Sequence, residues 1–154
     1  MSHVSTERYS HIQTASLYLI LYLLAIIAFG VVFTSVADPV GVWIAGSVGL
    51  LLAVFATAFQ YLKVSDEGDA LQIQFGPLPL FQRRVRYSDI ASAEPGRTQF
   101  IEGWGIHYSL SRGGWVWNLW GFDCVEVRFK TGSVLRIGTD DPTNLSAFIQ
   151  SRLN

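Results

Sequence analysis

Residues 15–36 read ASLYLILYLLAIIAFGVVFTSV, and residues 40–59 read VGVWIAGSVGLLLAVFATAF. No Asp, Glu, Lys or Arg occurs in residues 10–37 or in residues 39–62. At 1.5 Å per residue, a helix of about 22 residues is about 33 Å long, enough to cross a hydrocarbon core of about 30 Å. A helix in a globular core is rarely apolar on every side over such a length. The two stretches therefore predict two transmembrane helices, over residues 15–36 and 40–61.

The link between the two stretches, Asp38-Pro39, predicts a tight hairpin. Proline disfavours a helix at the preceding residue and fits the first turn of the next helix. The link carries no Lys or Arg, whereas Arg8 precedes the hairpin and Lys63 follows it. The positive-inside rule then places both termini in the cytoplasm. The alternative, a signal peptide cleaved after residues 35–37, requires a much shorter apolar core of about 7–15 residues.

The second stretch carries small residues at every fourth position. They are Gly41, Ala45, Gly49 and Ala53. Residues at this interval share one face of a helix, and small ones allow another helix to approach closely. The neighbouring helix is either the first span of the same chain or a helix of another protein.

The charged side chains lie almost entirely after the two spans, where the sequence pattern changes. Apolar and polar residues alternate in residues 71–75, 81–87 and 125–129. Alternation with a period of two is typical of half-buried antiparallel strands. Lys130-Thr131-Gly132-Ser133 separates two such segments and predicts a hairpin turn.

The end of the chain has the pattern of an amphipathic helix. Asp141 suits the N-cap and Pro142 suits the first helical position, which predicts a helix over residues 142–153. The chain is therefore expected to be an α+β membrane protein. A transmembrane hairpin at residues 1–62 precedes an antiparallel β domain at residues 63–154, which the last helix closes.

Four short motifs follow one another along the chain. They are LQIQFG at 71–76, VRYSDI at 85–90, GWGI at 103–106 and VLRIGTDDP at 134–142. In this order, after two membrane spans, they resemble the bacterial pleckstrin-homology (PH-like) membrane proteins over nearly the whole chain. The resemblance implies a partly open β-sandwich or barrel with a helix at one end, no catalytic activity and a place in the bacterial cytoplasmic membrane. The tryptophan-rich residues 115–122 depart from the family pattern.

Arg83, Arg84 and Arg86 form the one basic cluster close after the spans. Basic side chains at a membrane surface attract anionic lipid headgroups with about 1 kcal/mol each. The alternation places Arg84 and Arg86 on one strand face and Arg83 on the other. The competing interpretation is an ordinary solvated strand face.

Trp115, Trp117 and Trp120 lie in the tryptophan-rich residues 115–122. Tryptophan favours the membrane–water interface, a β core or the centre of a protein–protein contact. All three interpretations stay open. The loop at residues 76–81 is also apolar, and it either dips into lipid or forms a rigid turn.

Catalytic and metal-binding patterns are missing from the sequence. His3, His11 and His107 have no metal-ligand spacing, and a pair of Glu102 with His107 lacks a nucleophile. Cys124 has no second cysteine, and a net charge of −1 gives no basic field for nucleic acid. The sequence therefore predicts no enzyme, metal or cofactor. It favours a membrane-anchored module that binds anionic lipid or a protein partner, and the alternative is an accessory subunit of a larger membrane complex.

Overall fold

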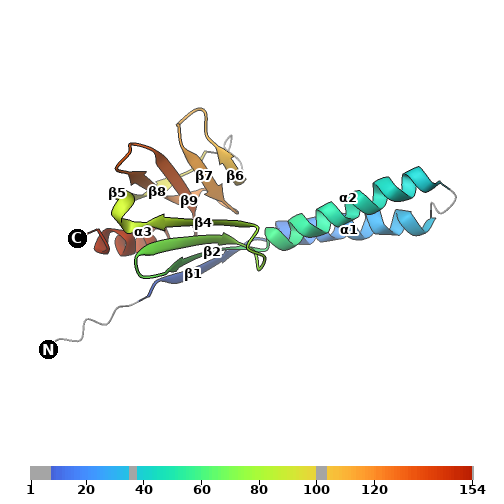
Figure 1. Ribbon diagram of the computed structural model, residues 1–154, viewed down its shortest axis with the longest axis horizontal. Helices are drawn as coiled ribbons and strands as arrows, with labels where there is room; N and C mark the ends of the chain where they lie inside the picture. The colour runs from blue at the N-terminus through green and yellow to red at the C-terminus, as the bar shows by residue number, and fades with distance from the viewer. Residues whose placement is uncertain (1–7, 35–37, 100–103, 154) are drawn as a thin grey trace. The chain divides into compact units, whose positions relative to one another are not determined.

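The computed structural model describes residues 8–34, 38–99 and 104–153 (Figure 1). The predicted α+β class is confirmed, because two long apolar helices precede two β-sheets and a C-terminal helix. The chain forms two compact units. The helical unit consists of Ala15–Tyr61 and Phe75–Phe81, and the β unit contains the remaining residues.

The helical unit is built from α1 (Leu17–Thr34) and α2 (Pro39–Ala58), and both are long and apolar enough to span a membrane. The Asp38 carboxylate accepts a hydrogen bond from the Val40 N–H at 3.2 Å, so α2 begins where the sequence predicts. It ends at Ala58, because the chain enters a strand at Tyr61. Residues 35 and 36 of the expected first span lie outside the described residues.

The first sheet of the β unit has four strands in the order β1-β2-β3-β4. These are β1 (Ser10–Thr14), β2 (Tyr61–Asp66), β3 (Ala70–Phe75) and β4 (Phe81–Arg86). Alternate residues of β2 and β3 are fully buried, among them Leu62, Val64, Leu71 and Ile73. Strand β1 precedes the helices in sequence, so the β unit includes residues outside 63–154.

The second sheet has five strands in the order β5-β8-β9-β7-β6. These are β5 (Ile90–Arg97), β6 (Gly105–Tyr108), β7 (Trp115–Asn118), β8 (Asp123–Phe129) and β9 (Val134–Gly138). The predicted β8–β9 hairpin pairs Val125 with Ile137 and Val127 with Leu135 in its buried centre. Strands β7 and β9 are parallel, unlike the expected all-antiparallel arrangement, because β8 reverses the chain between them.

The C-terminal helix α3 (Pro142–Ser151) buries Leu145 and Ile149. Gln150 donates to the carbonyl oxygen of Ala93 at 2.7 Å, which ties α3 to β5. Asp141 occupies the N-cap position, but its carboxylate accepts from the Asn144 side chain at 2.8 Å and from no backbone N–H of the helix. The helix also ends two residues before the expected residue 153.

Candidate functional site

A pocket of about 240 Å³ lies where β4, the short 3-10 helix η1 (Tyr87–Asp89) and the β8–β9 turn meet. We call it the basic pocket. Its lining residues are Arg83, Ser88, Asp89, Phe129, Lys130, Thr131 and Ser133. The Lys130 N–H donates to the Asp89 carbonyl oxygen at 2.9 Å and holds η1 against the end of β8. All the lining residues belong to the β unit.

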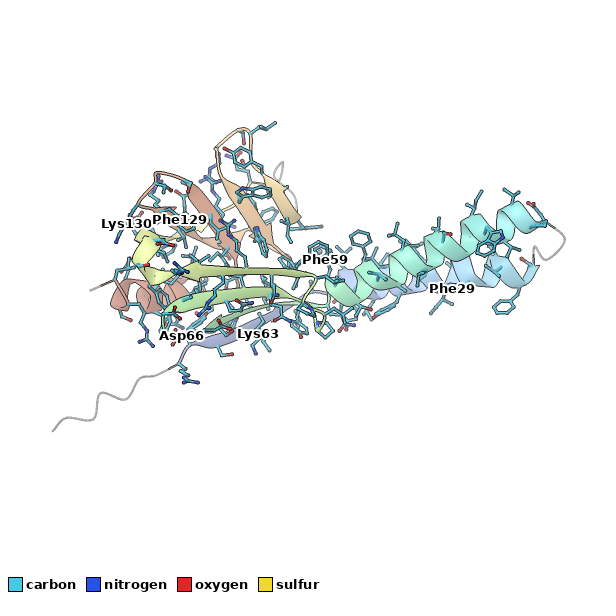
Figure 2. All side chains as sticks on the ribbon, viewed as in Figure 1. Phe29, Phe59, Lys63, Asp66, Phe129 and Lys130 are labelled. Atoms are coloured by element: carbon cyan, nitrogen blue, oxygen red, sulfur yellow. The ribbon has the colours of Figure 1, made fainter. Side chains whose placement is uncertain are left out.

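Arg83 is the half-buried cation of this pocket. Its guanidinium carbon lies 5.8 Å from the centre of the Phe129 ring, within the range of a cation–π contact. Burial lowers the pKa of Arg83, but a guanidinium remains charged at neutral pH. Within the described part of the chain, no carboxylate lies within 4.0 Å of it. Figure 2 shows Phe129 and Lys130 beside each other at the end of β8.

The other groups of the pocket are mostly hydrogen-bond donors. The hydroxyls of Thr131 and Ser133 lie 3.0 Å apart, and Ser88 donates to the Asp89 carboxylate at 3.2 Å. The lining therefore contains two cations, three hydroxyls and one carboxylate. Such a set suits an anion with several oxygen atoms, because a guanidinium matches carboxylate and phosphate oxygens with two donors at once.

Arg84 and Arg86 do not line this pocket. Arg84 pairs with Glu67 at 3.3 Å and with Asp69 at 2.7 Å, and both carboxylates lie in the turn between β2 and β3. Arg86 is exposed on the same face of β4. The structure therefore separates the basic cluster, because Arg84 is already engaged by two carboxylates while Arg83 lies on the opposite face.

The three tryptophans occupy different environments. Trp117 is buried in the core of the β unit, whereas Trp115 is 44% exposed and Trp120 is 43% exposed. Trp115 packs edge-to-face on Tyr108 of β6 at 5.9 Å, and Trp120 stacks on Trp104 at 4.2 Å. We call β6, β7 and their flanking aromatics the aromatic hairpin (residues 104–120). It forms an edge of the second sheet.

The small residues of α2 face different neighbours. A Cβ atom on Gly49 would lie 3.2 Å from the Phe29 ring of α1, and one on Gly41 would lie 2.6 Å from the Asp38 carboxylate. Ala45 is partly buried, and Ala53 accepts a hydrogen bond from Thr57 at 2.9 Å through its carbonyl oxygen. Gly49 thus allows α1 and α2 of the same chain to approach closely.

Substituting Gly49→Leu is expected to lower the free energy of unfolding by about 1–3 kcal/mol, because the new side chain collides with Phe29. Gly30→Leu in α1 is the matched control, since a Cβ atom there meets no neighbour within 4 Å. That control should be neutral or slightly stabilising through its higher helix propensity. Thermal unfolding in detergent measures both. Equal effects of the two substitutions would show that Gly49 does not determine helix packing.

The candidate metal-binding and acid–base residues of the sequence lie apart or outside the described residues. They contain no cluster of three His, Cys, Asp or Glu side chains that could hold a metal. His11 of β1 bonds to Asp140 near α3, a contact that the sequence did not indicate. Glu102 and His3 lie outside the described residues, and Cys124 is buried.

Sequence reasoning identified Arg83 but missed the residues around it. Lys130, Thr131 and Ser133 were interpreted only as a turn, and Ser88 only as part of a motif. The sequence feature that could have indicated this pocket is a turn with a lysine and two hydroxyl side chains. The hydrogen bond from Lys130 to η1, however, is known only from the three-dimensional fold. No family model matches the chain, and no curated protein matches it.

Proposed function

We propose that the chain is a non-enzymatic, membrane-anchored PH-like module that binds a phosphate-bearing anion in the basic pocket. Helices α1 and α2 anchor it in the bacterial cytoplasmic membrane, with both termini in the cytoplasm. An anionic lipid headgroup and a free phosphate compound both supply the phosphate oxygens that such a pocket would bind. The observation that supports this most strongly is Arg83, half-buried against Phe129 and unpaired with any carboxylate in the described residues.

The energetics favour a modest affinity. A hydrogen bond to a charged group contributes about 1.5–3 kcal/mol, and the Phe129 ring restricts the orientation of the Arg83 guanidinium. Lys130 adds a second positive charge on an exposed side chain. The negative charge of Asp89 repels the anion and lowers its affinity for the pocket. Because the pocket is open to solvent, salt should weaken the interaction.

The test is the thermal unfolding of the full chain in neutral detergent, with inorganic phosphate or chloride at equal ionic strength. Phosphate at about ten times its dissociation constant should stabilise the protein by about 1.4 kcal/mol, or about 3–6 °C. Arg83→Gln should remove this shift, whereas Arg86→Gln on the same strand should retain it. An equal phosphate shift in wild type and Arg83→Gln would refute the site.

The aromatic hairpin supports a second candidate function, that of an accessory subunit in a membrane complex. Leu110 at its tip is 92% exposed, and Tyr108 and Trp115 beside it are 52% and 44% exposed. Exposed aromatics on an edge strand are typical of protein–protein contacts. In mild detergent, a stoichiometric companion that Leu110→Asp releases, and Leu78→Asp does not, would favour this function over the module.

A further inference from the structure

Residues 76–80 form an apolar loop between β3 and β4, and we call it the anchor loop. Its sequence is GPLPL, with no charged residue. Leu78 is 42% exposed and Leu80 is 55% exposed. The loop belongs to the helical unit rather than the β unit, so its position relative to α2 is defined.

Gly76 fixes the start of the anchor loop against the end of α2. Its N–H donates to the Tyr61 carbonyl oxygen at 2.8 Å. A Cβ atom on Gly76 would lie 2.5 Å from the carbonyl oxygens of both Thr57 and Ala58. Its φ of +61° also lies in the left-handed region that favours glycine. Only glycine therefore permits this close approach.

Phe59 holds both ends of the loop. Its ring lies 5.2 Å from the ring of Phe75, which precedes the loop, and 5.6 Å from the ring of Phe81, which follows it. Phe59 is also the C-cap residue of α2 (labelled in Figure 2). The two exposed leucines are thus held at the point where the second apolar helix ends.

The same end of the helix pair carries amphipathic and polar side chains. The Tyr22 hydroxyl bonds to the Thr57 hydroxyl at 2.8 Å and accepts from the Gln60 amide at 3.0 Å. Tyr18 packs edge-to-face on Tyr22. Tyrosines concentrate where a transmembrane helix passes from hydrocarbon to headgroups, so this end has the composition of a membrane–water boundary.

We infer that the anchor loop inserts Leu78 and Leu80 into the interfacial layer of the bilayer beside α2. The inference rests on the membrane anchoring in the proposed function and is independent of the basic pocket. The loop begins at the end of α2, whose exposed apolar side chains, among them Leu51 and Val54, lipid would cover. Pro77 and Pro79 have no N–H group, so insertion leaves fewer backbone donors without a hydrogen-bond partner.

The test is nitroxide depth measurement on the full chain in phospholipid nanodiscs. Single cysteines are placed at Leu78 and Leu80 in a Cys124→Ala background. Reference labels are placed at Leu50, an exposed residue of α2, and at Glu94, an exposed residue of β5. Collision with oxygen reports an apolar environment, and collision with a nickel chelate reports water.

Labels at Leu78 and Leu80 should collide with the nickel chelate several-fold less than the label at Glu94. If they match the label at Glu94 while the label at Leu50 reports hydrocarbon, the loop inference is overturned and the membrane anchor stands. If the label at Leu50 also reports water, the anchor fails together with the inference.

A pair of glycine variants tests whether Gly76 holds the anchor loop against the end of α2. Gly76→Ala should move the label at Leu78 toward water, because the new methyl group collides with the end of α2. Gly68→Ala is the control, since Gly68 also has a positive φ but meets no neighbour within 4 Å. If the label at Leu78 collides with the nickel chelate equally often in Gly76→Ala and in the parent protein, Gly76 does not hold the anchor loop in place.

Discussion

Replacing Asp66 by alanine is expected to lower the free energy of unfolding of the β unit by about 3 kcal/mol. The Asp66 side chain is 1% exposed. Its carboxylate accepts hydrogen bonds from the Tyr87 hydroxyl at 2.9 Å, the Gly68 N–H at 2.9 Å and Arg152 at 2.8 Å. Alanine would remove the acceptor that these three donors share, and it would leave the buried Tyr87 hydroxyl without this partner.

Tyr87 is the buried donor of this hydrogen-bond group around Asp66. Burial, and after it the hydrogen bond to Asp66, raises the pKa of the Tyr87 hydroxyl above its usual value. Asp69→Ala is the matched control for Asp66→Ala, because Asp69 pairs with Arg84 through an exposed side chain. That surface pair should contribute less than about 1 kcal/mol. Denaturant unfolding followed by tryptophan fluorescence measures both, and equal losses would contradict the buried role of Asp66.

Substituting Arg136→Met should have a comparably large effect, a loss of about 3–5 kcal/mol. Arg136 is 3% exposed, and its side chain donates to Glu126 at 3.1 Å and to the Gly113 carbonyl oxygen at 2.9 Å. The contact with Glu126 compensates the negative charge of a half-buried carboxylate. The second fixes the turn of the aromatic hairpin, so the variant should also loosen Trp115.

Arg128→Met provides the comparison for this second prediction. Arg128 contacts the same Glu126 carboxylate, but its side chain is 57% exposed. Its loss should cost less than about 1 kcal/mol, since solvent screens the pair. Denaturant unfolding of the two variants under identical conditions separates the roles. If Arg128→Met were as harmful as Arg136→Met, burial would not explain the stability of this cluster.

The helices could be predicted from sequence because the signal is local. A charge-free run of spanning length requires no partner to be recognised, and Asp38-Pro39 marks the start of α2 through its own backbone preferences. The alternation in β3 and in β8 is equally local, since one sheet face is buried. These local patterns were sufficient to predict the α+β fold class.

The parts that escaped prediction depend on long-range pairing. Strand β1 is a short segment with one buried side chain, Gln13, and it becomes a strand only because β2 lies beside it. Arg83 and Lys130 are far apart in sequence and meet through η1. The engagement of Arg84 by Glu67 and Asp69 also depends on the strand register, which alternation alone does not fix.

Selective acylation of the two lysines of the chain, Lys63 and Lys130, tests anion binding in the basic pocket. Lys130 lines the basic pocket and Lys63 does not, so Lys63 serves as an internal reference (Figure 2). The full chain is compared in nanodiscs of zwitterionic lipid, in the same discs with inorganic phosphate, and in discs with anionic lipid. Mass spectrometry measures the acylation rate of each lysine.

We expect Lys130 to be protected relative to Lys63 in at least one anion-containing sample, and Arg83→Gln to abolish this protection. Protection by anionic lipid alone would identify a headgroup as the ligand, and protection by phosphate alone would identify a free phosphate compound. Equal acylation of Lys130 in all three samples, or protection that persists in Arg83→Gln, would show that the basic pocket binds no anion through Arg83.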